Sequence, residues 1–261
     1  MLNRKLIGSL VGTACLMAVA VDAAVVGEWK MNEGAGSDVH DSSGNGYTFS
    51  PVGSGSGTGY SWTSTSGGLT AAAGNESYLH ATIANNQFTY QVTAEAWIKP
   101  TGADTDGSQI ISLLNGFALC TVNSGADLRF ITYSNETWRD VYADIDALSS
   151  HYLYDGNFHH VVGVFDGIRD VNGKINVSLF IDGVLANRNS IATASDVVVG
   201  YGAGLTGTDL YMGQNAWLST ITSQNFMGDI YGVRITNVPE PVAVSMLALG
   251  GLALLRRRKA F

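Results

Sequence analysis

Stretches in which hydrophobic and polar residues alternate recur along the middle of the chain, and they predict β-strands. The clearest stretch covers residues 174–181, where Ile175, Val177, Leu179 and Ile181 occupy every second position. Successive side chains of a strand point to opposite faces, so these four residues share one face. The stretch is therefore predicted to be a strand with one side against a hydrophobic core.

The neighbouring residues predict an antiparallel meander over 155–188. Residues 158–165 are rich in Val and aromatic side chains, which favour a buried strand before this one. The dipeptide Asp182-Gly183 accepts positive φ at little cost and predicts a tight hairpin, after which the strand resumes at Val184.

Further short strands are predicted at hairpin spacing along the rest of the chain. They cover residues 25–31, 77–83, 88–100, 109–114, 117–122, 128–133, 141–145, 196–199, 209–213 and 226–235. Residues 47–75 are rich in Gly, Ser and Thr and predict loops with short irregular strands. No segment of residues 24–238 has the 3.6-residue periodicity of an amphipathic helix, so one all-β antiparallel sandwich over residues 24–237 is expected.

Charge and cysteine content narrow the possible partners. Residues 24–238 hold 8 basic and 20 acidic residues, a net charge of −12. Such an acidic surface repels phosphate backbones, so nucleic acid is not expected as a partner.

Cys120 is the only cysteine of this region, which rules out an internal disulfide there, and its apolar neighbours predict a buried side chain.

The N-terminus predicts a secretory signal peptide over residues 1–23. Two basic residues among the first five are followed by an apolar stretch over 6–21, and small residues precede the expected cut after Ala23. Cys15 leaves a lipoprotein signal as the alternative, although Gly12 stands where a lipobox has Leu or Val.

The C-terminal residues 238–261 have an equally distinct pattern. Pro239-Glu240-Pro241 precede 14 uncharged residues, 242–255, and the tail then carries Arg256, Arg257, Arg258 and Lys259. As a helix the uncharged stretch spans about 21 Å, less than the roughly 30 Å of a bilayer core. Basic side chains at its end can reach the interface, which makes a membrane-held tail with a cytoplasmic end possible.

This tail resembles the PEP-CTERM sorting signal. The resemblance implies that an exosortase, a transpeptidase-like membrane enzyme, removes the tail near Pro-Glu-Pro and delivers the protein to the cell surface. It also implies a Gram-negative envelope and an association with exopolysaccharide production. The alternative is an ordinary membrane anchor that stays uncut.

The meander carries motifs that resemble the laminin-G-like, concanavalin A-like jelly-roll domains. They are Asp155-Gly156, Phe158-His159-His160-Val161, Asp166-Gly167 and Ile181-Asp182-Gly183-Val184. The opening residues 25–46, the strand over 93–100 and the closing residues 226–235 are similar to the same family in the same order. Phe158 stands where the family usually has Trp. Asn32 and Tyr231 stand where it usually has an acidic residue. The resemblance implies a jelly-roll β-sandwich.

The same resemblance implies a structural Ca²⁺, held by carboxylates and backbone carbonyls of loops. Asp41 and Asp229 are the candidate ligands, because the terminal strands lie close together in the family fold. The alternative is that an Asp in such a turn caps backbone amides.

Carbohydrate binding needs exposed aromatic rings and polar groups that orient the sugar. Trp62, Trp138 and Trp217 lie in polar, loop-like surroundings and are the candidate ligand-binding residues. Trp29 and Trp97 lie in predicted strands and are expected in the core.

No catalytic pattern stands out. Glycoside hydrolases of this fold need paired carboxylates, and their E-x-D-x-x-E pattern is absent; the nearest pair, Asp144 and Asp146, has no third acid at that spacing. His159 and His160 are adjacent on a strand, so they point to opposite faces and do not share a metal. We expect an exported, non-catalytic surface or matrix protein that binds carbohydrate or another envelope component. A polysaccharide hydrolase or lyase and a purely structural matrix protein are the alternatives.

Overall fold

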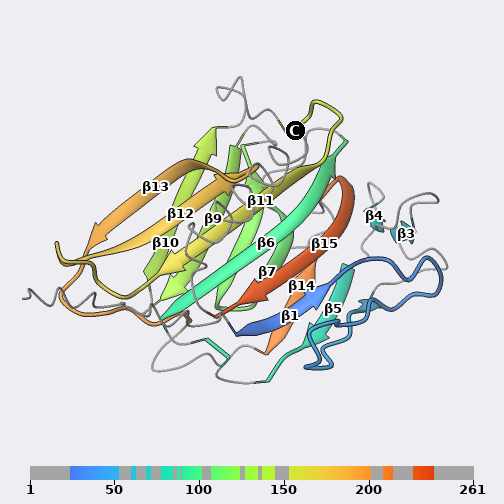
Figure 1. The fold of residues 1–261 in the computed structure, drawn as a ribbon, viewed down its shortest axis with the longest axis horizontal. Helices are drawn as coiled ribbons and strands as arrows, with labels where there is room; N and C mark the ends of the chain where they lie inside the picture. The colour runs from blue at the N-terminus through green and yellow to red at the C-terminus, as the bar shows by residue number, and fades with distance from the viewer. Residues whose placement is uncertain are drawn as a thin grey trace, which may run out of the picture.

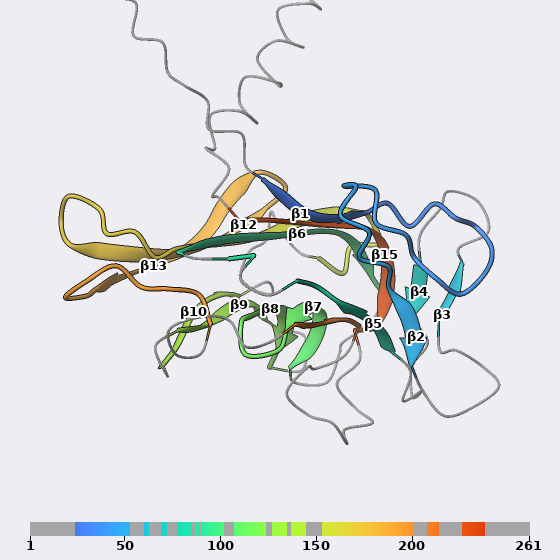
Figure 2. The same cartoon turned by 90° about the horizontal axis from the view of Figure 1, so that it is seen from below.

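Two antiparallel sheets packed face to face form the fold of the computed structural model (Figures 1 and 2). The structure describes residues 24–52, 60–62, 69–71, 78–84, 87–88, 90–101, 107–123, 127–134, 137–144, 153–200, 208–213 and 226–237. For residues 60–62 and 69–71 only the backbone is described. Within these ranges the regular elements are all strands, which confirms the predicted all-β sandwich.

The first sheet, called here the β6 sheet, has eight strands. Their order is β13 (Val184–Ala192), β12 (Lys174–Ile181), β11 (His159–Asp166), β6 (Gln91–Pro100), β15 (Gly228–Thr236), β4 (Leu69–Ala71) and β3 (Tyr60–Trp62), with β1 (Val25–Trp29) also paired to β15. The pairing of β1 with β15 brings the two ends of the described region together.

The second sheet, called here the β8 sheet, has seven strands. Their order is β10 (Thr137–Asp144), β9 (Asp127–Ser134), β8 (Phe117–Val122), β7 (Ser108–Leu113), β14 (Asp209–Met212), β5 (Tyr78–Thr82) and β2 (Ser50–Val52). Figure 2 shows the two sheets as stacked layers.

The inner faces of the two sheets form one hydrophobic core. The four alternating residues of β12 are all fully buried, as the pattern predicted. Phe117 and Phe130 of the β8 sheet and Phe165 of the β6 sheet fill the space between the layers. Gly163 of β11 lies directly under Phe130, where a Cβ would come within 2.1 Å of the ring.

The hairpin between β12 and β13 has the predicted geometry. Ile181 pairs with Val184, and the two residues between them, Asp182 and Gly183, have φ values of 52° and 78°. Positive φ at both central residues matches the type I′ turn, whose twist suits the flanking strands.

Three predictions about strands and tryptophans were wrong. Residues 196–199 form no strand. Val197 is buried and its amide donates to the Gly167 carbonyl, so this segment covers the core with a single backbone bond and no strand pairing. Strand β10 begins at Thr137, so Trp138 lies in a strand and not in a loop. Trp97 is 37% exposed on the outer face of β6, whereas Trp29 is fully buried in the core.

The paired histidines point to opposite faces, as expected. His159 is buried, and its Nδ1 and Nε2 lie 2.8 Å from Asp182 Oδ2 and 3.0 Å from Asp155 Oδ1. The imidazole thereby ties the turn before β11 to the β12–β13 hairpin. Burial alone would lower the pKa of His159, but the bonds to Asp182 and Asp155 outweigh it and raise that pKa.

This arrangement predicts a pH-dependent contribution to stability. Because the folded-state pKa of His159 is above the unfolded value of about 6.5, the protonated imidazole stabilises the fold. This contribution is complete below the unfolded value and is lost as the pH rises through the folded-state pKa. We expect the urea midpoint of the wild type to fall relative to that of His159→Gln as pH rises from about 6 to 9. Parallel midpoints across this range would show that the imidazolium does not stabilise the fold.

Candidate functional site

Exposed aromatic side chains follow the outer face of β10, at one edge of the β8 sheet. Val141 and Ala143 of β10 face the core, so Trp138, Asp140 and Tyr142 face outward. Trp138 is 45% exposed and Tyr142 is 38% exposed. Four residues of strand place these two side chains about 13 Å apart along the strand.

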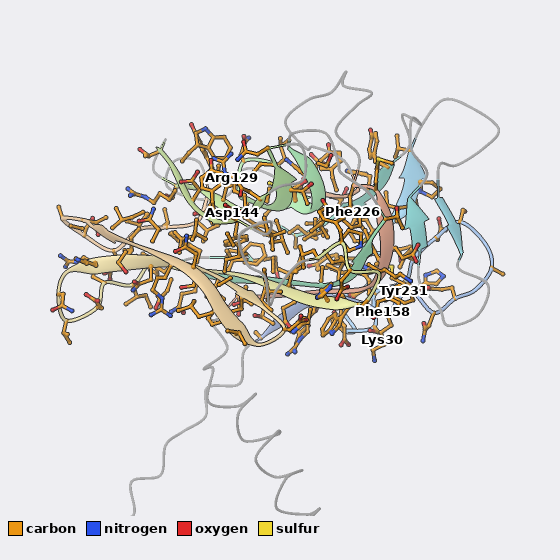
Figure 3. All side chains as sticks on the ribbon, turned by 90° about the horizontal axis from the view of Figure 1, so that it is seen from above. Lys30, Arg129, Asp144, Phe158, Phe226 and Tyr231 are labelled. Atoms are coloured by element: carbon orange, nitrogen blue, oxygen red, sulfur yellow. The ribbon has the colours of Figure 1, made fainter. Side chains whose placement is uncertain are left out.

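Residues of β9 complete this surface. The Tyr133 ring lies 4.3 Å from the Trp138 ring, and the Arg129 guanidinium lies 4.7 Å from the centre of the Tyr142 ring. Arg129 Nη2 also lies 2.6 Å from Asp140 Oδ2. These residues, Arg129, Tyr133, Trp138, Asp140 and Tyr142, are called here the β10 strip; Figure 3 labels Arg129 and, at the end of β10, Asp144.

The Tyr142 phenol of the β10 strip stays protonated near neutral pH and is hydrogen-bonded to the Asp140 side chain. Burial, and then a hydrogen bond involving Asp140, raise the pKa of the Tyr142 phenol to about 12. The phenol therefore keeps its proton. The strip combines two exposed ring systems with a guanidinium, a carboxylate and a phenol, which is a set of groups able to stack on and hydrogen-bond to a hydroxyl-rich ring.

Strand β13 of the opposite sheet supports β10 from the edge. The side-chain amide of Asn187 donates to the Tyr142 carbonyl, and that of Asn189 donates to the Asp140 carbonyl at 2.9 Å. The backbone that carries the β10 strip is thus bonded to β9 on one side and to these amides on the other. Such support favours a preorganised surface.

The middle of the outer face of the β8 sheet is not open. Ser112 of β7 and Ala118 and Cys120 of β8 point outward by their register, yet all three are buried. The burial of Cys120 agrees with its prediction as a small hydrophobe. Toward the other edge of the β8 sheet, the Tyr211 ring of β14 lies 5.1 Å from the His80 ring of β5. These two rings form a smaller aromatic group.

The candidate calcium ligands have protein partners. The Asp41 carboxylate accepts hydrogen bonds from the amides of Glu28, Ser43 and Tyr47. Burial alone would raise the pKa of Asp41, but these bonds lower it. Asp229 of β15 accepts a bond from the Tyr231 hydroxyl at 3.3 Å.

Among the residues that the structure describes, no group of three or more His, Cys, Asp or Glu side chains is placed to hold a metal ion. The contacts of Asp41 fit the alternative in which it caps its own turn. Calcium at Asp41 and Asp229 stays a prediction.

The other sequence-based candidates are only partly visible. The backbone of Trp62 lies in β3, at the edge of the β6 sheet, but its side chain is not described. Trp217, Asp146, the proposed signal peptide and the tail with Pro239, Glu240, Pro241 and its basic cluster lie outside the described residues. Within the ranges given above, no helix is long and apolar enough to cross a membrane.

Sequence reasoning missed a second aromatic group on the outer face of the β6 sheet. Trp97 stacks on His160 with ring centres 4.4 Å apart, and Phe158, 48% exposed, meets Tyr231 edge-on at 3.9 Å. Figure 3 shows Phe158 and Tyr231 over the layer opposite to Arg129. The parity of Trp97 with Thr93 and Glu95 was the sequence signal for this orientation.

Comparison with known families places the chain. Residues 73–239 match Laminin_G_3, described as the concanavalin A-like lectin/glucanases superfamily. The chain therefore belongs to this family, as its motifs had suggested. No curated protein sequence matches the chain.

Solved structures of botulinum neurotoxin share the fold. One is a type C structure, whose description states that cell entry depends on interaction with two ganglioside molecules. It has a TM-score of 0.63 at 14% sequence identity, and the match covers 88% of this chain and 51% of the type C chain. The serotype D ligand-binding domain in complex with N-acetylneuraminic acid has a TM-score of 0.59 at 16% identity, with 87% and 51% covered. The chain thus spans about half the length of these structures, and the likeness shows the fold alone.

Proposed function

We propose that the protein is a non-catalytic carbohydrate-binding protein and that the β10 strip contacts the glycan. The observation that carries this proposal is the placement of Trp138 and Tyr142 on one open strand face, with the Arg129–Asp140 pair beside them. Aromatic rings stack on the apolar face of a sugar, and the charged pair supplies donors and acceptors for hydroxyl groups.

The family and its structural relatives support this choice of ligand. The family includes lectins as well as glucanases, and two of the similar neurotoxin structures are described with ganglioside or N-acetylneuraminic acid. Fold likeness does not fix function, so the argument depends on the side chains of the strip.

We further propose that the protein is exported, sorted by an exosortase through its C-terminal tail and retained at the cell surface or in the extracellular matrix. The glycan is then an exopolysaccharide or another envelope component. The tail motif supports this proposal. A structural Ca²⁺ at Asp41 and Asp229 belongs to the same proposal.

One observation favours glycan cleavage as a second candidate function. Asp127 and Asp144 are directly opposite each other on β9 and β10, and both belong to the outward-facing set. Opposed side chains have Cβ atoms about 4.5–5.5 Å apart, so their carboxyl groups can come within the roughly 5–5.5 Å that retaining glycosidases use. However, the side chain of Asn123 already donates to Asp127.

The test is equilibrium binding of the purified full-length protein to a glycan panel. The panel contains dextran, a sialylated glycan and exopolysaccharide extracted from the host, with calcium and again with a chelator. We expect saturable binding, and Trp138→Ala and Tyr142→Ala should each weaken it about 10- to 30-fold, as loss of a stacking anchor does. Tyr90→Ala, which removes another exposed aromatic ring, is the matched control and should bind normally.

Each alternative has its own outcome. Unchanged binding in both strip variants would exclude the β10 strip as the contact surface. Glycan that is shortened by the wild type, and left intact by Asp144→Asn, would favour the enzyme. Absence of binding to every glycan would favour the purely structural matrix protein.

A further inference from the structure

Strand β13 forms one edge of the β6 sheet. It is nine residues long, Val184–Ala192, and among the described strands it pairs with β12 alone. Figure 1 shows β13 at the margin of the molecule. An edge strand presents N–H and C=O groups to which a further strand can bond, so proteins usually cap, shorten or interrupt such edges.

The other sheet edges in the described ranges have protection of this kind. On the free side of β1, the Asp41 carboxylate accepts from the Glu28 amide, and the Ser42 amide donates to the Glu28 carbonyl at 2.7 Å. Two asparagine side chains of β13 donate to backbone carbonyls of β10. Strands β2 and β3 are three residues long, and β2 contains Pro51. Strand β13 has neither the short length nor the proline.

The ladder between β11 and β12 determines which backbone groups of β13 point outward. The Asp182 amide donates to the His160 carbonyl, so the even-numbered residues of β12 are bonded to β11. The residues of β13 opposite them are Arg188, Ser190 and Ala192. These three residues therefore direct their N–H and C=O groups away from β12, toward the open edge.

Most of these outward groups are available to a further strand. The Arg188 amide donates to the Asn187 side chain at 2.7 Å. In the part of the chain that the structure describes, no backbone bond from another element reaches Ser190 or Ala192 on this side. The bulge of β13 lies before Arg188, so the strand is regular from there to its end.

Charge favours a second copy of this chain as the partner at this edge. Residues 24–238 hold 8 basic and 20 acidic residues, so like charges oppose the approach of two copies. Residues 183–195, however, include no acidic residue and a single basic one, Arg188. The repulsion between two copies is therefore smallest when they meet through β13.

We propose that β13 pairs antiparallel with β13 of a second copy, with the pairing centred on Ser190. Ser190 of one copy then faces Ser190 of the other, and Arg188 faces Ala192. This register uses all three outward residues of each copy and keeps the two Arg188 side chains apart, because like charges directly opposite each other destabilise a sheet. Main-chain hydrogen bonds thereby continue the β6 sheet across both copies.

The pairing also determines how the two β10 strips are placed. Directly opposed side chains of a sheet point to the same face, so the β6 sheets of the two copies face the same way, and so do their β8 sheets. Because β13 is bonded to the backbone of β10, the two strips lie on either side of the joint. One long glycan can then contact both strips, which raises avidity. This consequence rests on the proposed function, whereas the pairing itself does not.

Sedimentation equilibrium of the full-length protein tests the pairing in the absence of glycan. The wild type should show a reversible, concentration-dependent equilibrium between monomer and dimer. Ser190→Pro removes the central outward N–H, a change that an edge strand tolerates, and should raise the dissociation constant of the dimer at least about tenfold. Ser190→Ala is the matched control. It loses the hydrogen bond from the Ser190 hydroxyl to Asn176 but keeps the N–H, and it should dimerise like the wild type.

Ser190→Cys tests the register. Directly opposed residues of a hydrogen-bonded antiparallel pair have Cα atoms about 5.5 Å apart, which is within the range of a disulfide. Under mild oxidation the variant should form a covalent dimer. Arg188→Cys is the control, because its counterpart in the second copy lies about 13 Å away along the strand. It should cross-link at least about tenfold less, and Cys15 and Cys120 are common to both variants.

Three outcomes would overturn the proposal. The first is a wild type that stays monomeric up to about 1 mM. The second is a dimer that is unchanged in Ser190→Pro, because association through another surface does not depend on this strand edge. The third is equal cross-linking of the two cysteine variants. If Ser190→Pro does not fold, Ser190→Lys replaces it, since it places like charges directly opposite each other at the centre of the pairing. None of these outcomes bears on glycan binding by the β10 strip.

Discussion

Trp29→Ala is expected to lower the free energy of unfolding by about 3–5 kcal/mol, the usual cost of removing a buried large aromatic side chain. Trp29 is fully buried at the end of β1, and its ring meets Phe49 edge-on at 4.8 Å. Its Nε1 donates to the Tyr47 carbonyl at 2.6 Å. The substitution therefore leaves a cavity beside Phe49 and an unpaired Tyr47 carbonyl.

Trp97→Ala is the matched control, because it makes the same chemical change on the outer face of the same sheet. Trp97 is partly exposed, so the change removes less buried surface and should lower the unfolding free energy far less. Urea unfolding of the two variants provides the comparison. Equal losses of stability would mean that Trp29 does not anchor the core as described.

Gly163→Ala is expected to lower the free energy of unfolding by about 1–3 kcal/mol through overpacking between the sheets. The added Cβ would lie 2.1 Å from Cδ2 and 2.2 Å from Cγ of Phe130. Phe130 is fully buried on β9, so its ring has little room to move away. The two sheets can approach this closely here because residue 163 is a glycine.

Gly232→Ala serves as the control for this prediction. It adds the same methyl group to a strand of the same sheet, but toward the outer face, where the nearest atom is 3.3 Å away. Its urea midpoint should lie close to that of the wild type. A Gly163→Ala protein as stable as Gly232→Ala would show that the sheets separate here at little cost.

The strands of the core could be predicted from the sequence because their alternation is regular. Strands β8 and β12 have the predicted ends, and the Asp182-Gly183 hairpin has the predicted turn. Residues 196–199 look like a strand because they are hydrophobic, but their backbone only touches Gly167. Hydrophobic content alone does not distinguish a strand from an extended segment that covers the core.

The candidate site was less predictable because it depends on which sheet face is open. Trp138 was correctly chosen as an exposed aromatic residue, but its neighbours Arg129 and Tyr133 come from another strand and become visible only through the register. Trp97 was assigned to the core because aromatic residues in strands are usually buried. Its parity with Glu95 pointed outward, and the structure confirms that orientation.

The measurement that tests the central claim most directly is the affinity of the full-length wild type and Trp138→Ala for host exopolysaccharide, with glycan length recorded in the same samples. The account predicts saturable binding by the wild type, affinity about 10- to 30-fold weaker in Trp138→Ala, and glycan of unchanged length. Equal affinity of the two proteins, or glycan shortened by the wild type, would contradict a non-catalytic carbohydrate-binding protein that uses the β10 strip.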